Sequence, residues 1–308
     1  MTKEISEPAL SKDAEKGFLL ILFAALAWGS SFPVIKWGLG FINPLLFLTF
    51  RFLLACLVMI PFVNNSDGQI NRLFKNKFVI GLSVLNSAGY ILEFTGLIFT
   101  TASKASLLVN VNVVLVALFS TLLLRERLGK RKLIALILGL AGVAIITLDG
   151  DLSNLFTGSL IGDIMVVSAG VVWALYIVYS RKIVVSGNPG IDVGSVNLSW
   201  AIIILTTIIF SPAAAVYVLF EPTQLLGLLS FEAVFAIIYL GVVCTTIAFT
   251  LYFKGLKYVS ASSTALILLS EIVFAIVLSS ILLVEPVTVY IIIGGLLISS
   301  AIILLRKS

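Results

Sequence analysis

The chain contains 308 residues, of which 60% are hydrophobic and 11% are charged, and its net charge is +5. A soluble domain has about 25% charged residues, so this composition excludes an ordinary soluble domain with a single core. The sequence has no histidine and only two cysteines, both within apolar runs. A disulfide framework, a His-based metal site and His general-base catalysis are therefore unsupported.

The predicted elements are ten apolar helices, because crossing the hydrocarbon core of a bilayer takes about 20 apolar residues in a helix. A tail of residues 1–16 precedes them, and we expect the first helix to remain uncleaved. The two halves of the series cover residues 17–149 and 158–306, which gives an all-α integral membrane protein. In chain order the windows are Gly17–Gly40, Pro44–Val63, Phe78–Phe99, Ser103–Leu124, Leu133–Leu148 (beginning nearer Lys130), Ser159–Val185, Val193–Phe220, Phe231–Phe253, Ser260–Val284 and Val287–Leu305.

Basic residues fall on alternate connections between these windows. Of the 20 Lys and Arg residues, 17 lie in the tail, at the C-terminus or in every second connection, as around Lys75 and Lys130. The other connections contain acids such as Asp151 and Glu221. Because cytoplasmic loops collect Lys and Arg, we expect a multi-pass protein of the cell membrane with both termini in the cytoplasm.

The second half of the chain resembles the first. A shift of 145 residues superposes Trp28 on Trp173, and a shift of 159 superposes Gly96 on Gly255. Each half contains five predicted helices, and an odd number places the second half upside down relative to the first. Inverted repeats recur in secondary transporters, where the substrate site lies near the midplane between the halves.

Two sets of residues are similar to those of a known family. The run from Ala27 to Phe32 has a counterpart at Trp173, and Glu126 and Glu285 occupy equivalent places before the last helix of each half. On these residues, and on their order and spacing, nearly the whole chain resembles the EamA branch of the drug/metabolite transporter superfamily. The resemblance implies ten helices around a central cavity. It also implies alternating-access transport of small metabolites, often the export of amino acids or related compounds.

The chain departs from this family in two respects. The family often has proline in the middle of its fourth and ninth helices, where this chain has Val113 and Ile272, so a Pro-dependent kink is unsupported there. The first helix also lacks the acid of the small multidrug resistance relatives, so their proton-coupling Glu cannot be transferred to this sequence.

Arg51 and Glu93 are ionisable residues at similar depth within predicted helices. Such residues are costly in a bilayer and normally face a cavity or a partner. The sequence leaves two interpretations open. The two residues form a buried ion pair that fixes helix packing, or they receive the opposite charges of a zwitterionic substrate, with the Arg fork suited to a carboxylate.

Asn86, Tyr90 and Glu93 share one face of the third predicted helix. The equivalent positions by the repeat, in the eighth helix, are Thr245, Phe249 and Tyr252. Such polar and aromatic stripes line a cavity or join helices by hydrogen bonds. Glycines such as Gly139, Gly142, Gly294 and Gly295 are expected to allow close helix approach. The predicted substrate-binding residues are Trp28, Arg51, Asn86, Tyr90, Glu93, Asn112, Trp173, Tyr176, Thr245, Tyr252 and Glu271.

Glu271 is the predicted proton-coupling residue. It lies about 16 to 21 Å from either end of its helix, near the bilayer centre, and its repeat counterpart is the neutral Asn112. Burial disfavours a charged carboxyl, so Glu271 could take up and release a proton during transport. The alternative is a permanently protonated or hydrogen-bonded structural group.

We expect a secondary transporter, because the sequence contains no P-loop for a nucleotide-driven pump. The expected partners are a small-molecule substrate and the lipid bilayer, without nucleic acid, cofactor or metal, and a monomer is compatible with the sequence. The alternatives are a proton-coupled drug efflux protein, a channel, and an intramembrane enzyme with an aspartyl-type dyad.

Overall fold

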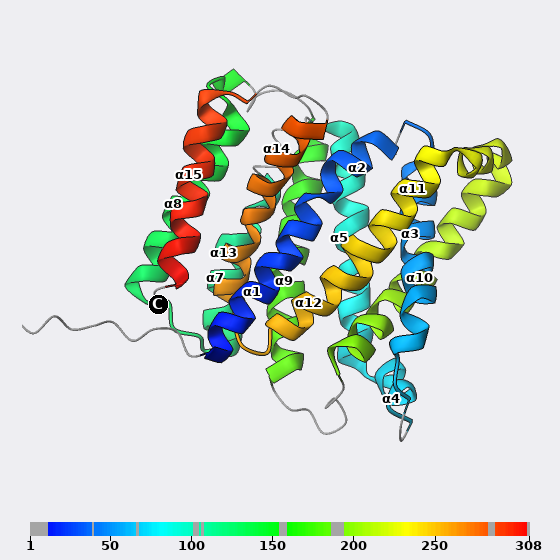
Figure 1. The fold of residues 1–308 in the computed structure, drawn as a ribbon, viewed down its shortest axis with the longest axis horizontal. Coiled ribbons are helices and arrows are strands. Elements are labelled where there is room, and N and C mark those ends of the chain that lie inside the picture. Colours follow the sequence, from blue (N-terminus) through cyan, green and yellow to red (C-terminus); the bar gives the residue numbers. More distant parts are fainter. Residues whose placement is uncertain are drawn as a thin grey trace, which may run out of the picture.

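The computed structural model describes residues 12–38, 40–65, 68–100, 105, 108–153, 159–185, 194–282 and 287–306. Over these ranges the chain is helical and contains no strand (Figure 1). The tail before residue 12, the start of the fourth predicted window and the segment with Glu285 lie outside the described residues.

The first half of the chain forms a series of mostly long helices. Asn43 and Asn76 cap two of them, because their side chains accept the backbone N–H of Leu45 and Phe78. The helices are α1 (Lys12–Gly29), α2 (Ser31–Gly38), α3 (Pro44–Met59), η1 (Ile60–Phe62), the short α4 (Gln69–Lys75), α5 (Lys77–Phe99), α7 (Asn112–Leu124) and α8 (Lys130–Leu148).

The second half repeats the pattern of long helices and short connections. Ser230 and Ser260 cap helices in the same way, by accepting the backbone N–H of Ala233 and Ser263. The helices are α9 (Leu160–Val185), α10 (Ser195–Phe220), η4 (Pro222–Leu229), α11 (Phe231–Tyr239), the π-helix η5 (Leu240–Ile247), α12 (Ala248–Gly255), α13 (Ala261–Leu268), α14 (Ser270–Leu282) and α15 (Val289–Arg306).

Large apolar side chains cover the outside of this bundle. Among the described residues, seven helical stretches are long and apolar enough to cross a membrane, and two shorter apolar helices accompany them. Leu57, Leu122, Ile137, Ile208 and Leu296 are all exposed. A soluble protein buries most of its large apolar residues, so this surface fits lipid. The chain is a multi-pass membrane protein.

Three predicted helices are interrupted rather than straight. The first window divides at Ser30, where Ser30 and Ser31 donate hydrogen bonds to the carbonyls of Ala27 and Trp28. Hydroxyls that bond back to the preceding turn bend helices. The eighth window contains the π-helix η5, and the ninth divides at Leu269. Neither the spacing of apolar residues along the sequence nor the hydropathy predicts such interruptions.

Helices from the two halves pack against each other in pairs. α8 packs on α15, α5 on α9, α1 on α12, α3 on α10 and α7 on α13. Glycines permit the closest approaches: a Cβ added at Gly142 would lie 2.6 Å from the Gly294 carbonyl oxygen, and one at Gly294 would lie 2.5 Å from that of Gly142. The prediction was wrong for Gly295, which faces open space. Only one of these adjacent glycines can point at α8.

One end of the bundle is held by charged side chains. The Glu126 carboxylate accepts the backbone N–H of Ala261 and Ser262 at 2.9 and 3.3 Å, which caps the first turn of α13. Lys132 Nζ donates to Ser260 Oγ at 2.9 Å in the same turn. Glu126 is thus a structural capping residue that ties the connection before α8 to α13.

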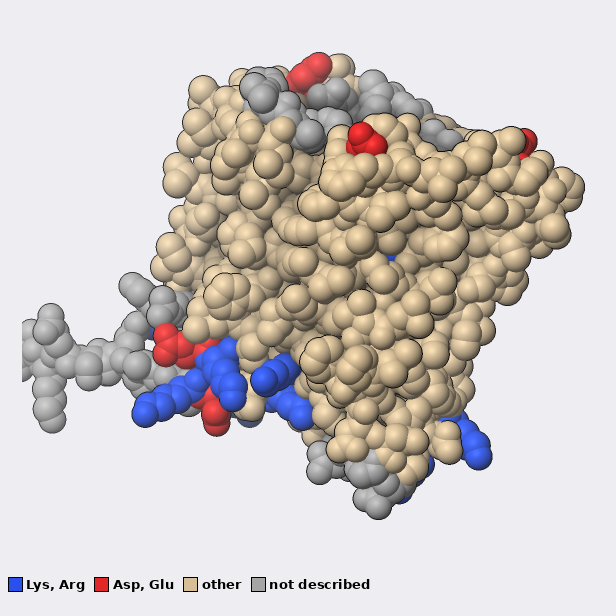
Figure 2. Space-filling view, turned by 45° about the vertical axis from the view of Figure 1, so that its right-hand side comes forward, with Lys and Arg blue, Asp and Glu red and all other residues tan. Residues whose placement is uncertain are grey.

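Basic side chains gather at this same end. Figure 2 shows Lys and Arg at the end where α1 begins and α15 ends, with tan surface over the middle of the face. Acidic residues lie both at the opposite end and beside the basic ones. The charge distribution divides the molecule into two polar ends and an apolar band.

The glycine contact between α8 and α15 predicts a difference between two neighbouring substitutions. Gly294→Ala should lower the free energy of unfolding by about 1–3 kcal/mol, because its methyl group meets backbone that has little room to move. Gly295→Ala, on the open side of the same helix, is the matched control and should be nearly neutral. Denaturation of purified protein in mixed micelles would measure both, and equal effects would contradict the packing described.

Candidate functional site

Seven aromatic rings form a closed circuit near the middle of the bundle. Trp28 lies 5.5 Å from Tyr252 and 5.6 Å from Phe249, measured between ring centroids. Trp173 lies 5.1 Å from Tyr90 and 5.9 Å from Tyr176. The circuit closes through a stacked Tyr176–Tyr252 pair and through Phe52, which contacts both Tyr90 and Phe249. We refer to these seven residues as the aromatic ring of the site.

Arg51 is fixed beside this ring by neighbouring backbone and side chains. Its Nε donates to Thr245 Oγ1 at 2.8 Å, and its Nη2 donates to the Cys244 carbonyl at 3.4 Å. The Trp28 indole donates to the same carbonyl at 2.9 Å. Cys244 and Thr245 lie in the π-helix, whose altered hydrogen-bond pattern lets one carbonyl receive two side-chain donors. Arg51 is only 4% exposed.

Glu93 lies on the other side of the ring, on α5. Its Oε2 accepts a hydrogen bond from the Trp173 indole at 2.8 Å. A Cβ added at Gly89 would be 2.8 Å from the Trp173 ring, so the glycine lets the indole lie against α5. Among the described residues, Arg51 and Glu93 share neither a hydrogen bond nor an ion pair. The interpretation of these two residues as a direct ion pair was therefore wrong, because each is held by a different neighbour.

Glu271 is at the start of α14, just after the break at Leu269. It is half-buried, and its carboxyl makes no hydrogen bond to a described residue, Asn112 included. Its backbone is close to α1, since a Cβ at Gly29 would lie 2.6 Å from the Glu271 carbonyl oxygen. Glu271 and Glu93 are within electrostatic range of each other, and both are within range of the Tyr90 hydroxyl.

The polar face of α5 points away from the lipid side. Ile80, Val84 and Ile91 are exposed and share one face of the helix. At about 100° per residue, Glu93 lies about 180° from Val84 around the axis. Glu93 is nevertheless half-buried rather than buried, so its exposed part faces the interior of the bundle.

Nine of the eleven predicted site residues lie in this cluster. Asn86 lies about two turns along α5 from Glu93 and donates to Thr206 Oγ1 at 3.2 Å, so it joins α5 to α10. Asn112 begins α7, is half-buried, and makes no hydrogen bond to a described residue. The structure places Trp28, Arg51, Tyr90, Glu93, Trp173, Tyr176, Thr245, Tyr252 and Glu271 together.

Three members of the site were not among the predicted substrate-binding residues. Phe52 and Phe249 complete the aromatic ring, and the Cys244 carbonyl orients Arg51 and Trp28. Phe249 is the repeat counterpart of Tyr90, but it was not counted among those residues. Nothing in the sequence indicated Cys244, because a backbone carbonyl becomes available only where the helix departs from the α pattern.

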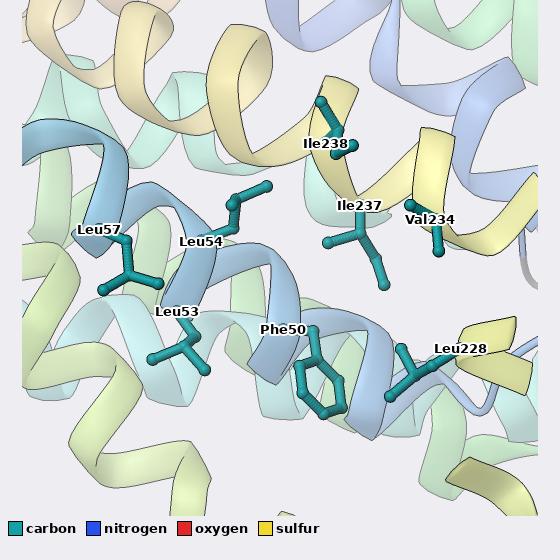
Figure 3. A pocket seen from close by; sticks show the side chains of 8 residues that line it. All are labelled: Phe50, Leu53, Leu54, Leu57, Leu228, Val234, Ile237 and Ile238. Carbon is teal, nitrogen blue, oxygen red and sulfur yellow. The ribbon is translucent and has the colours of Figure 1, made fainter. Parts of the chain in front are cut away.

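A separate apolar groove lies on the outside of the bundle between α3 and α11 (Figure 3). Its volume is about 280 Å³, and all of its lining side chains are apolar. It contains no group that could orient a polar solute, and lipid chains are the surrounding solvent of such a surface. The lining residues are Phe50, Leu53, Leu54, Leu57, Leu228, Val234, Ile237 and Ile238.

Comparison with known proteins identifies the family. The profile of the EamA-like transporter family matches residues 15–148 and again residues 160–307. The chain belongs to this family. An uncharacterized transporter of Archaeoglobus fulgidus is 28% identical over 286 residues, covering 92% of this chain and 94% of the relative. The uncharacterized transporter YvbV of Bacillus subtilis is 30% identical over 296 residues, covering 94% and 90%.

A solved structure has the same fold. A protein crystal structure superposes with a TM-score of 0.74 at 19% identity, and the match covers 94% of this chain and 96% of that one. The EamA resemblance predicted from the Ala27 to Phe32 run is therefore confirmed. In the structure that run contains the Trp28 indole of the site, the Gly29 contact with α14 and the helix break at Ser30.

The hydrogen bonds of Arg51 predict which residue it is energetically coupled to. A double-mutant cycle of Arg51→Met with Thr245→Val should give a coupling energy of about 1–2 kcal/mol, because the two groups are bonded at 2.8 Å. The parallel cycle with Glu93→Gln should give a smaller value. Unfolding in mixed micelles would measure both cycles, and stronger coupling to Glu93 would contradict the arrangement described.

Proposed function

We propose that the protein is a secondary transporter that moves small metabolites through the central site by alternating access. In this proposal ten membrane-spanning helices form two inverted five-helix repeats, residues 17–149 and 158–306, and the aromatic ring lies between them. The observation that supports it best is the group of Arg51, Glu93 and Glu271 around the ring. Charged and aromatic groups gathered at mid-depth in a membrane protein mark a solute pathway.

Contacts within the site support the inverted repeat. Trp28 contacts Phe249 edge to face, and their counterparts Trp173 and Tyr90 make the same contact, with interplanar angles of 84° and 88°. In both pairs a tryptophan of one half meets a residue of the other. Such a pattern is expected from a two-fold axis in the membrane plane.

Glycine contacts and helix breaks also follow the two-fold relation between the two halves of the chain. A Cβ at Gly255 would approach the Gly17 carbonyl oxygen at 3.1 Å, and a Cβ at its counterpart Gly96 would approach that of Gly162, the counterpart of Gly17, at 3.2 Å. Leu269 accepts a short-range hydrogen bond from Ile272, three residues later, and the counterpart Asn110 accepts one from Val113. The family profile also matches the chain twice, once in each half.

The orientation in this proposal places both termini in the cytoplasm of a cell-membrane protein. The gathering of Lys and Arg at the end where α1 begins supports it. A cysteine introduced at Lys75 should be protected from a membrane-impermeant thiol reagent in intact cells, and one at Asp151 should react. Labelling with the opposite pattern would reverse the orientation. Cys56 and Cys244 are buried, which keeps the background low.

The proposed substrates are amino acids or related compounds that leave the cell, as the family resemblance suggests. Vesicles that contain the purified protein should transport members of a panel of labelled amino acids, and empty vesicles should not. Tyr90→Ala and Glu93→Ala should lower the initial rate by about tenfold or more, because each removes a group of the site. Ile91→Ala and Val84→Ala, on the lipid face of α5, are matched controls. Equal loss on both faces would contradict the proposal.

Glu271 is the proposed proton-coupling residue. Its carboxyl has no hydrogen-bond partner among the described residues, and the titratable groups within its electrostatic range are Glu93 and Tyr90. Glu271→Gln keeps the shape and removes the proton-binding group. It should abolish transport driven by a pH gradient while equilibrium exchange of substrate persists.

Glu221→Gln, at an exposed position, is the control for this variant. Uptake measured between about pH 5 and pH 8 would test the role of Glu271. A Glu271→Gln variant that accumulates substrate against a gradient as well as the parent would exclude it. Gradient-driven transport of drugs but not of amino acids would favour the alternative of a proton-coupled drug efflux protein.

A further inference from the structure

The charged groups of the site differ in how accessible they are. Arg51 is 4% exposed, and its guanidinium is already bonded to Thr245 and to the Cys244 carbonyl. Glu93 and Glu271 are both half-buried, and the exposed part of Glu93 faces the bundle interior. The carboxyl groups of the site are therefore more accessible than its cation.

The aromatic surfaces next to these carboxyls are suited to the same kind of ligand. Trp28, Tyr90 and Trp173 are half-buried, so part of each ring is accessible, and Trp173 is bonded directly to Glu93. The faces of tryptophan and tyrosine attract cations through their quadrupole, most strongly when water is excluded. A carboxyl together with several aromatic faces is the arrangement that recognises an ammonium group.

Two buried hydroxyls of the aromatic ring have the Ser180 side chain as a neighbour. Tyr252 is 1% exposed and Tyr176 is 4% exposed, and Ser180 interacts with both, although no hydrogen bond of normal geometry reaches either hydroxyl from a described residue. A buried hydroxyl whose hydrogen bonding is incomplete is costly and is normally satisfied by water or by a ligand. Its oxygen can accept an N–H from a solute that reaches the ring.

We propose that the site recognises its substrate by an ammonium group, which binds between Glu93 and Glu271 against the indoles of Trp28 and Trp173. This inference rests on the transport function proposed above and specifies its substrate class: amines and amino acids, but not carboxylic acids that lack an amine. Arg51 has the separate role of holding α3 against the π-helix. To receive a substrate carboxylate with the same N–H groups, it would have to give up its bonds to Thr245 and Cys244.

A matched series of three compounds tests the inference. Phenethylamine, phenylalanine and 3-phenylpropanoate share one aromatic skeleton and differ in whether they contain an amine, a carboxylate or both. Binding of labelled phenethylamine to the unmodified protein in lipid nanodiscs should be saturable, with empty nanodiscs as background. Unlabelled phenylalanine should displace the amine, and 3-phenylpropanoate should do so at least about tenfold more weakly.

Variants identify the groups responsible. Glu93→Gln should weaken phenethylamine binding by about tenfold or more, and Glu221→Gln, at an exposed position outside the site, should leave it unchanged. The compound series needs no variant, so it remains informative if Glu93→Gln fails to fold.

The outcomes separate this inference from the transport proposal. Displacement by 3-phenylpropanoate as strong as by phenylalanine, or no saturable binding of phenethylamine, would overturn the inference even if vesicles transport other solutes. Selective binding of the two amines without any movement across vesicles would support the inference and overturn the transport function.

Discussion

The Cys244 carbonyl oxygen is the point on which the arrangement of the site depends. Within a bilayer, backbone polar groups must be satisfied inside the protein, because no water replaces a missing hydrogen bond. The π-helix presents this carbonyl to the Trp28 indole and the Arg51 guanidinium. One backbone atom therefore joins α1, α3 and the helix that leads into α12, and it fixes a ring member and a cation at the same time.

Close approach between α1 and α14 places the second half of the site. The Gly29 position meets the Glu271 carbonyl oxygen, so a side chain at residue 29 would push Glu271 away from the ring. The adjacent serines satisfy two carbonyls of α1 where the helix divides. The short run from Ala27 to Ser31 thus supplies a member of the aromatic ring, a close contact with α14 and the break between α1 and α2. These three roles give a physical reason why the residues occur together.

The sequence was sufficient to predict the helical fold class, the family and most residues of the candidate site. The depth of a residue in the membrane follows from counting residues along its helix. Depth was enough to select Arg51, Glu93 and Glu271 as candidate site residues. Direction around each helix axis depends on packing, and there the predictions were weaker. Arg51 and Glu93 lie at similar depth but have different partners, Thr245 and Trp173. Gly294 and Gly295 are adjacent in sequence, yet only Gly294 meets α8.

Helix interruptions were the other feature that could not be predicted. The ninth predicted helix lacks the proline that many family members have there, and it nevertheless divides at Leu269. Ser270 donates to the Ile267 carbonyl at 2.7 Å and so replaces part of the lost helical bonding. A local side chain can thus satisfy an interruption that neither periodicity nor hydropathy reveals.

The position of Glu271 beside this interruption has an electrostatic consequence. A residue in the first turn of a helix is near unpaired backbone N–H groups and the positive end of the helix dipole, which favours a negative carboxyl. Removal from water and the proximity of Glu93 oppose that charge. Glu271 therefore experiences opposing influences that a carboxyl in the middle of an unbroken helix would lack. Its repeat counterpart Asn112 begins α7 in the same way but carries no proton, so of these two equivalent positions only Glu271 can respond to pH.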